Sequence, residues 1–442
     1  KNITFGLFAA EQLTASDGTS IPADGLMETI GIDENGNAVF TTDIPCGASL
    51  YVQEIGTDDH YILSDKKSPV VFEYAGQDVA KVEIEANDGE AIENTLKRGK
   101  VSGWKVDQDG FELGGAVIGL FRFDETEFTE ETALMVTESN EIGYFEFDNV
   151  PAGNFLVREI ASPEAFVLTE EIFPVEITED GKTVFITVEN KFIRGDIKGF
   201  KVDEDGKSVA GALFGLFTED DTEFTEENAV LTAVSDADGV FTFQNVRFGK
   251  WIVRELKPAE GFVLNETEFP VDITTDGAVI EIKAENRHIY GAVHTTKVDK
   301  DYPDHLLTGA VFEVYRDVNE NQQFDPDVDE LVGTLSECEP GLYELAELCY
   351  GGYFLYEKQA PVNYVKDNGY YYFEIVTDGE MVKVENQVGI GFINAHMVGS
   401  LKIVKASSDD RVEGFSFRIT GENYDEVFTT DANGEIFIEH LR

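Results

Sequence analysis

The chain repeats a lysine, a glutamate and an asparagine at a fixed spacing, each at the end of a short segment of alternating apolar residues. The complete sets are Lys105–Glu159–Asn190, Lys201–Glu255–Asn286 and Lys297–Glu357–Asn394. Between the first two sets every member advances by the same 96 residues, from 105 to 201, from 159 to 255 and from 190 to 286. Since a domain of about 100 residues builds one core, this period predicts tandem domains of one kind.

The alternation predicts that the three side chains point into a core. In a strand, residues two and four positions apart share a face. In the first set, each polar residue is the last on the apolar face of its predicted strand. The three faces are Val101–Gly103–Lys105, Phe155–Val157–Glu159 and Ile186–Val188–Asn190. Charged side chains are rarely buried unless they are paired. The pattern therefore predicts one buried cluster of the three residues in each domain.

Short alternating segments separated by Gly, Asp and Asn turns predict an all-β fold, with tandem immunoglobulin-like β-sandwiches in an elongated array. The predicted domains are 1–97 (partial, with its first strand missing), 98–193, 194–289, 290–398 (complete, with an acidic loop insertion) and 399–442 (partial, without its C-terminal half). Glu54 and Asn94 belong to a fourth set whose lysine is missing, and Lys405 opens a fifth.

The spacing also chooses between two asparagines near the end of the 290–398 repeat. Asparagines 94, 190, 286 and 394 each lie 11 residues before the lysine of the next set, at positions 105, 201, 297 and 405. This constant step selects Asn394 over Asn386.

The acidity of the chain excludes some partners. The formal net charge is −54, while a hydrophobic content of 42% is sufficient for folded domains. Such a surface repels nucleic acid and anionic membranes, and there is no run of 18 apolar residues. We therefore expect no nucleic-acid partner and no membrane insertion.

A buried amine, carboxyl and amide are the groups needed for a covalent cross-link that the protein makes itself. Burial favours the uncharged forms of amine and acid, so a proton can pass from ammonium to carboxylate. The neutral amine then attacks the asparagine carbonyl, the acid polarises its oxygen, and ammonia leaves. The alternative is a hydrogen-bonded cluster without a covalent link.

These roles extend to every set. The residues given the catalytic role are Glu54, Glu159, Glu255 and Glu357, and those given the isopeptide role are Lys105, Asn190, Lys201, Asn286, Lys297, Asn394, Asn94 and Lys405. Because the reaction happens once per domain, it is maturation and not enzymatic turnover, and no cofactor is required.

One acidic loop is similar to a calcium-binding loop. The candidate ligands are Asp317, Asn319, Asn321, the Gln323 carbonyl, Asp325 and Asp329. Two features depart from the pattern: position 6 is Gln322 in place of glycine, and the last carboxylate comes one residue late. The alternative is a plain acidic turn.

Cysteine is scarce, which suggests that something other than disulfides braces the domains. Cys338 and Cys349 flank a predicted strand that would hold them beyond disulfide reach. A disulfide between them requires a tight turn near Pro340–Gly341.

Several motifs resemble the SpaA-like, or Cna protein B-type, prealbumin-like domains of Gram-positive surface proteins and pilins. These are "GFKVDEDG", "GALFGLF", "VRE" followed by "PAEGFVL", and a closing "ENRHI", repeated with changes along essentially the whole chain. In "SPEAFVL", Ala165 occupies the position where the motif usually has glycine. The segment "APVNYVK" lacks both the glutamate and the glycine of the motif.

The resemblance implies a transthyretin-like β-sandwich, a cell-wall location and a lysine–asparagine isopeptide bond formed with a catalytic acid. It implies a structural stalk of a cell-surface adhesin whose partners are its neighbouring repeats, with a host matrix protein reached through a tip outside this sequence. Alternatives are a pilus subunit polymerised by sortase, for which no polymerising-lysine motif is present, and repeats that themselves bind a host matrix protein.

Overall fold

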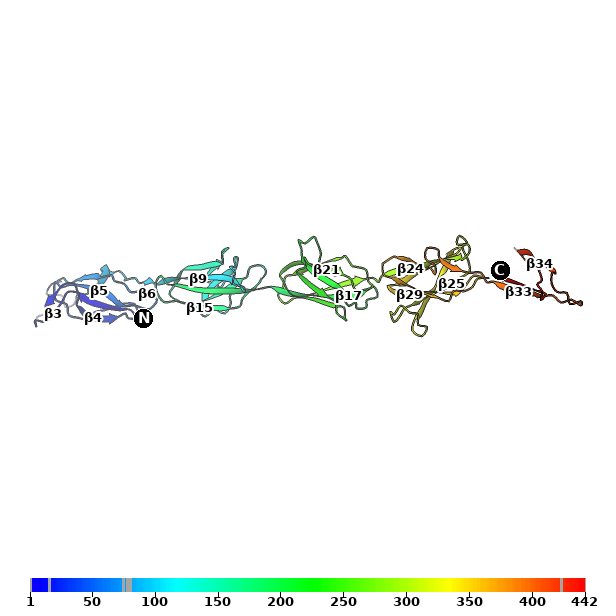
Figure 1. Cartoon of the computed structure of the whole chain (residues 1–442). Coiled ribbons are helices and arrows are strands. Elements are labelled where there is room, and N and C mark those ends of the chain that lie inside the picture. The colour runs from blue at the N-terminus through cyan, green and yellow to red at the C-terminus, as the bar shows by residue number, and fades with distance from the viewer. Residues whose placement is uncertain (1, 15–16, 74–75, 77–81, 422–423, 442) are drawn as a thin grey trace. The chain divides into compact units, whose positions relative to one another are not determined.

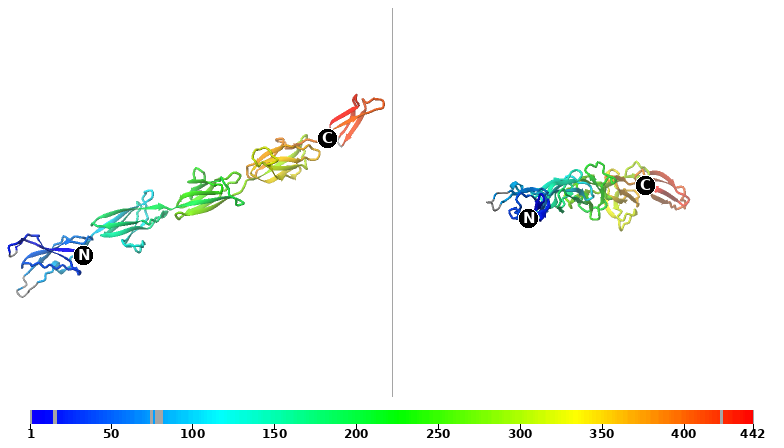
Figure 2. Two further views of the ribbon diagram at one scale, coloured as in Figure 1. Left: turned by 90° about the horizontal axis from the view of Figure 1, so that it is seen from below. Right: turned by 90° about the vertical axis from the view of Figure 1, so that its left-hand side faces the viewer.

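The structure is a computed structural model of the 442-residue chain that describes residues 2–14, 17–73, 76, 82–421 and 424–441. Over these residues the elements are β-strands, apart from one short 3-10 helix, η1 (Ala86–Gly89). The chain divides into two compact units, one mainly of residues 1–195 and the other mainly of residues 196–442. Figures 1 and 2 colour the strands by their place in the chain. The prediction of an all-β chain of tandem sandwiches is confirmed.

In the first unit, the 98–193 repeat forms two facing sheets. One has the order β12-β9-β16-β14 and the other β11-β10-β13-β15. Their bounds are β9 (Arg98–Asp107), β10 (Val117–Arg122), β11 (Met135–Glu138), β12 (Tyr144–Pro151), β13 (Gly153–Ala161), β14 (Phe166–Val167), β15 (Ile172–Ile177) and β16 (Thr183–Phe192). Val101 and Val188 of the first sheet and Leu120 and Val157 of the second are buried in one core.

The first and last long strands of this repeat, β9 and β16, are parallel neighbours. Their register pairs Lys105 with Val188 and Asp107 with Asn190. Parallel strands cannot be joined by a tight hairpin turn, so the rest of the repeat forms the connection between them. The lysine and the asparagine, distant in sequence, therefore lie on adjacent strands near the same end of the sheet.

The 194–289 repeat, most of which belongs to the second unit, has sheets β20-β17-β23 and β19-β18-β21-β22. Their bounds are β17 (Arg194–Asp203), β18 (Leu213–Thr218), β19 (Leu231–Val234), β20 (Val240–Arg247), β21 (Gly249–Lys257), β22 (Glu268–Ile273) and β23 (Val279–Asn286). β17 and β23 are parallel and pair Lys201 with Ala284. Gly199 lets Phe241 pack closely on β17, since a Cβ at position 199 would lie 1.9 Å from the ring.

The 290–398 repeat has the same plan with a broken last strand. Its sheets are β27-β28-β24-β31, with β32 also paired to β24, and β26-β25-β29-β30. Their bounds are β24 (Tyr290–Asp299), β25 (Val311–Arg316), β26 (Glu330–Thr334), β27 (Ser336–Glu339), β28 (Leu342–Cys349), β29 (Gly351–Gln359), β30 (Tyr370–Ile375), β31 (Met381–Lys383) and β32 (Phe392–Asn394). Thr295 replaces the close-packed glycine and donates to the Val384 carbonyl at 2.6 Å.

The two ends of the chain carry smaller sets of strands. In residues 1–97 a sheet β4-β1-β5-β7 covers one apolar core, and β2 pairs with β3 and β6 with β8. Their bounds are β1 (Thr4–Ala9), β2 (Leu13–Thr14), β3 (Ser20–Ile21), β4 (Leu26–Gly31), β5 (Ser49–Gly56), β6 (Tyr61–Ile62), β7 (Ser68–Val71) and β8 (Thr95–Leu96). Near the other end, β33 (Gly399–Val404) pairs with β36 (Glu435–Leu441), and β34 (Ser416–Gly421) with β35 (Tyr424–Thr429).

Candidate functional site

The structure brings each complete set of lysine, glutamate and asparagine into one buried cluster. The lysine and the asparagine come from the two parallel strands of one sheet, and the glutamate comes from the facing sheet. Glu159 lies on β13, Glu255 on β21 and Glu357 on β29. All nine side chains are at most 3% exposed. Each cluster therefore crosses the sandwich inside the core.

In every cluster the lysine amine lies next to the glutamate carboxylate. The distances from Nζ to Oε1 are 3.6 Å for Lys105–Glu159, 3.9 Å for Lys201–Glu255 and 2.9 Å for Lys297–Glu357. Lys105 also donates to the carbonyl of Val188, its parallel partner, at 3.1 Å. The amine is thus held against the strand that carries the asparagine.

Burial changes the acid–base behaviour of these lysines. Burial lowers the pKa of Lys201 to about 8, although the neighbouring Glu255 opposes this shift. The pKa of Lys297 is lowered to about 8 for the same reason, and that of Lys105 is lowered as well. With a pKa near 8, about one amine in ten is uncharged at pH 7. An exposed lysine has far less of the nucleophilic form.

Each asparagine donates from its amide nitrogen to the glutamate. The Nδ2-to-carboxylate distances are 2.8 Å for Asn190–Glu159, 2.9 and 3.0 Å for Asn286–Glu255, and 3.1 and 3.0 Å for Asn394–Glu357. The three amide oxygens are buried and have no hydrogen-bond partner among the described residues. Each cluster therefore contains an unused acceptor at its reactive carbonyl. A buried polar atom left unpaired costs free energy, so this oxygen is available for a new hydrogen bond.

Sequence reasoning missed a main-chain donor to each glutamate. The N–H ten residues after the glutamate donates to Oε2, at 3.0 Å from Thr169, 2.7 Å from Asn265 and 2.7 Å from Asp367. Its residue type differs in every repeat because the donor is a backbone group. Only the constant step of ten could have revealed it.

A β-bulge beside each glutamate was also not predicted. The pairing of β10 with β13 shifts between Val117 and Ile118, where Ile118 faces Glu159. The same shift occurs opposite Glu255 and Glu357. Because a bulge re-aims the side chains beside it, it helps direct the glutamate toward the lysine.

A left-handed turn connects the loop after the glutamate strand to the end of the repeat. Its central residues are Ala165, Gly261 and Asn363, with φ of 73°, 82° and 71°. Their carbonyls accept from the N–H groups of Ile193, Ile289 and Met397 at 2.8, 2.8 and 2.7 Å. Ala165 therefore keeps the turn that glycine makes in the next repeat.

The two incomplete sets lie in residues 1–97 and 399–442. Asn94 donates to Glu54 Oε1 and to Thr57 Oγ1, both at 2.8 Å, and the Ser64 N–H donates to Glu54 at 3.1 Å. The acid–amide pair of residues 1–97 thus has the geometry of the complete clusters. Lys405 is half-buried, with its amine 4.7 Å from the centre of the Phe415 ring.

The candidate calcium loop is held together by its own carboxylates. Asp317 accepts from the N–H groups of Asn321 and Gln322, and Asp329 accepts from those of Val318 and Asp325. In the described part of the chain, no group of three or more His, Cys, Asp or Glu side chains is arranged to hold a metal ion. Asn319, Gln323 and the other candidate ligands lie in this loop, and calcium binding stays a prediction.

Cys338 and Cys349 are free thiols. The tight turn that a disulfide would need is present at Gly341, with φ of 76°. Cys338 nevertheless faces the start of β28, where its thiol donates to the Leu342 carbonyl, while Cys349 lies at the far end of the same strand.

Across the described residues, the structure contains no helix with the length and apolar character of a membrane span. A model of the SpaA prealbumin-like fold domain matches residues 99–192, 195–288 and 291–388. Among curated proteins, none matches the chain.

The chain is similar to several solved structures, and the first of these shares its fold. The Bacillus anthracis TIE protein is 21% identical with a TM-score of 0.55, over 86% of this chain and 68% of that chain. A streptococcal ancillary pilin is 20% identical with a TM-score of 0.26, over 68% and 99%. BcpA, the major pilin subunit of Bacillus cereus, is 17% identical with a TM-score of 0.32, over 68% and 100%.

Proposed function

The chain belongs to the family of SpaA prealbumin-like fold domains, and we propose that it is a structural stalk of a Gram-positive cell-surface adhesin, outside the cell at its wall. In this proposal each complete repeat is braced by an autocatalytic isopeptide bond. The observation that carries the proposal is the buried lysine–glutamate–asparagine cluster. It occurs three times, on equivalent strands of three repeats and in the same register.

The reaction begins with a proton transfer. The lysine ammonium gives a proton to the adjacent carboxylate, which the lowered lysine pKa favours. The amide then turns its unpaired oxygen toward the glutamic acid, whose O–H donates to it. This contact polarises the carbonyl and satisfies the orphaned acceptor of the resting cluster.

Bond formation follows at the asparagine Cγ. Lysine Nζ attacks Cγ, the glutamic acid gives its proton to Nδ2 and takes one from the attacking nitrogen, and the Cγ–Nδ2 bond breaks. The ammonia carries this second proton away as ammonium. The carboxylate is restored, and the product is one Nζ–Cγ amide bond. Strands that hold amine and amide side by side supply the high effective concentration, and the dry core protects the intermediate from water.

The position of the bond suits a load-bearing protein. It joins the first strand of a repeat to its last, which are parallel neighbours in each repeat. Pulling on the two ends of a repeat then loads a covalent bond before the hydrogen bonds of the sheet. A stalk that holds a binding region away from the cell requires this resistance.

Intact mass measures the proposal directly. Each bond expels one ammonia, about 17 Da, so three closed bonds lower the mass of the chain by about 51 Da. Protease fragments should map the losses to the joined pairs Lys105–Asn190, Lys201–Asn286 and Lys297–Asn394. A chain whose measured mass equals its full sequence mass would overturn the proposal that isopeptide bonds form.

Polymerisation distinguishes the stalk from a pilus subunit. A sortase-linked pilin runs as a ladder of covalent multimers on a denaturing gel, whereas a stalk runs as one band. We expect one band from cell-wall extracts.

A further inference from the structure

The 290–398 repeat offers two asparagines where the other repeats offer one. Asn386 ends the sequence "KVEN", as Asn190 ends "TVEN" and Asn286 ends "KAEN". The third family match stops at residue 388, two residues after Asn386, just as the first two stop two residues after Asn190 and Asn286. By motif alone, Asn386 is the equivalent asparagine.

The structure places Asn394 in the cluster instead. β24 pairs with β31 up to His294–Lys383 and resumes with β32 at Lys297–Phe392. Three steps along β24 are thus matched by nine along the last strand, so six extra residues loop out between its two parts. The glutamate and its asparagine are 37 residues apart here, compared with 31 in the preceding repeats.

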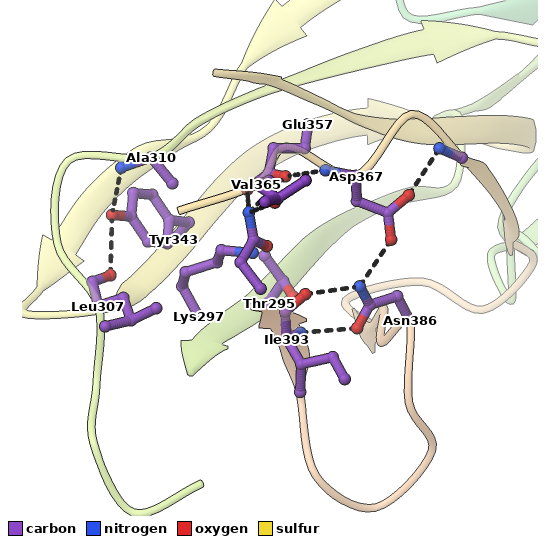
Figure 3. Close-up of polar contacts among 12 residues, drawn as sticks. Thr295, Lys297, Leu307, Ala310, Tyr343, Glu357, Val365, Asp367, Asn386 and Ile393 are labelled. Atoms are coloured by element: carbon purple, nitrogen blue, oxygen red, sulfur yellow. Dashed lines mark hydrogen bonds and ion pairs between the residues drawn. The ribbon is translucent and has the colours of Figure 1, made fainter. Parts of the chain in front are cut away.

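Asn386 lies in this loop and holds the strand that follows it (Figure 3). Its Oδ1 accepts from the Ile393 N–H at 2.6 Å, and its Nδ2 donates to the Ile393 carbonyl at 3.0 Å. Both main-chain groups of the residue before Asn394 are therefore bound by one side chain. The same Nδ2 donates to Asp367 Oδ2 at 2.8 Å, so Asn386 uses both of its polar atoms.

Asp367 connects this clamp to the catalytic acid. Its own N–H is the main-chain donor to Glu357, at 2.7 Å. Its carboxylate accepts from the Gly369 N–H at 2.7 Å and from the Tyr371 hydroxyl at 2.8 Å. Although burial opposes ionisation, these hydrogen bonds and that from Asn386 lower the pKa of Asp367, so it remains a charged acceptor that orients Asn386.

The preceding repeat makes the equivalent contact more directly. Asn265, ten residues after Glu255, donates from its side chain to the carbonyl of Glu285 at 2.8 Å. Glu285 directly precedes the acceptor Asn286. In both repeats an amide N–H thus holds the carbonyl before the acceptor asparagine, through Asn265 in one and through Asp367 and Asn386 in the other.

We propose that Asn386 is a positioning residue that pins β32 so that Asn394, and not Asn386 itself, reacts with Lys297. This inference rests on the proposed isopeptide function. Asn386 does not touch the reacting atoms; it acts by fixing the strand that presents Asn394, with Asp367 linking that strand to Glu357.

The experiment follows bond closure in the 442-residue chain, in timed samples from cell-free synthesis analysed by fragment mass spectrometry. Asn386→Ala should slow Lys297–Asn394 closure on the order of 100-fold, as expected when a reacting group loses its alignment. Lys105–Asn190 and Lys201–Asn286 should close at the normal rate in the same molecules. If those two bonds fail to form in the unmodified chain, the proposed function fails; if all three close normally in Asn386→Ala, only the positioning role is overturned.

A charge swap separates positioning from a general loss of stability. Asn386→Asp keeps the acceptor for the Ile393 N–H but faces Asp367 with a second carboxylate, and should slow closure. Adding Asp367→Asn restores a donor–acceptor pair between the two positions and should recover part of the rate. Equal rates in the single and double variants would overturn the proposal, and this comparison holds even if Asn386→Ala does not fold.

The acceptor itself gives a second readout. In the unmodified chain, the peptide that contains Lys297 should be joined to Asn394. In Asn394→Ala it should remain unjoined, because Asn386 is committed to Ile393 and Asp367. A Lys297–Asn386 bond in either protein would contradict the assignment.

Discussion

Lys201 Nζ lies 3.9 Å from Glu255 Oε1, with both side chains fully buried inside the 194–289 repeat. This carboxylate is also the acceptor for the amide of Asn286, at 2.9 and 3.0 Å. One acid thus contacts both reacting groups, as a proton carrier between an amine and an amide must. The same arrangement in three repeats makes the role of the acid testable in one of them, with the others as controls.

Replacing this acid should leave one bond open. In Glu255→Ala, Lys201 and Asn286 should stay unlinked because proton transfer and carbonyl polarisation are both lost. Intact mass should then show two ammonia losses in place of three, and the 194–289 repeat should melt earlier and become sensitive to trypsin. Closure of the Lys201–Asn286 bond at the normal rate would show that the glutamate has another role.

The buried lysine should make an unlinked repeat more stable at high pH. Asn286→Ala keeps Lys201 but removes its acceptor. Burial lowers the folded-state pKa of Lys201 to about 8, below its ordinary value of 10.5. Between these values the unfolded chain binds more protons, so stability rises with pH through this window and levels off above it.

Thermal unfolding of Asn286→Ala between pH 7.5 and about 10.5 measures this rise. The matched control adds Lys201→Met, which removes the titrating amine and should flatten the profile. A profile that falls or stays level with Lys201 present would mean that the buried amine remains charged.

The left-handed turn at Ala165 should be more stable with glycine at this position. Ala165 has φ of 73°, a left-handed conformation that costs a residue with a Cβ about 1 kcal/mol. Ala165→Gly should therefore stabilise the 98–193 repeat by up to about 1 kcal/mol. Gly261→Ala, at φ of 82° in the next repeat, should destabilise that repeat by at least as much, because its Cβ would also lie 3.2 Å from the Tyr350 ring. Hydrogen exchange resolved by repeat measures both, and equal protection in all variants would contradict the strain argument.

Calcium binding by the 317–329 loop remains a prediction with a clear test. Chelation should lower the melting temperature of the 290–398 repeat alone, since a ligand stabilises the state that binds it. The affinity should be weak, about 0.1–1 mM, because the central glycine is absent and the last carboxylate is displaced. Asp317→Ala should remove the effect, and the 98–193 and 194–289 repeats, which lack the loop, are controls. Titration calorimetry without heat at millimolar calcium would leave a plain acidic turn.

The clusters were predictable because strand geometry has a period of two. Once Lys105, Glu159 and Asn190 were each placed on an apolar face, burial and pairing followed from the cost of an unpaired charge. The constant step to the next lysine likewise favoured Asn394, since the distance from the end of one sandwich to the start of the next is set by the fold.

The supporting contacts were not predictable in the same way. The N–H of Asn265 that holds Glu255 is a main-chain group, so no residue type marks it. The clamp of Asn386 on Ile393 depends on how six extra residues loop out, which alternation does not specify. The bulge opposite Ile118 changes the local register without a distinctive residue.

The adjacency of the first and last strands has a topological consequence. Once the bonds close, residues 105–190, 201–286 and 297–394 are covalent rings, connected in series by the open segments 191–200 and 287–296. A protease that cuts once inside a ring opens it without parting the molecule, because the isopeptide bond still joins the two sides. A single cut in an open segment divides the chain. The short connections between rings are therefore where cleavage would shorten the stalk, and most of its length can be nicked without being lost.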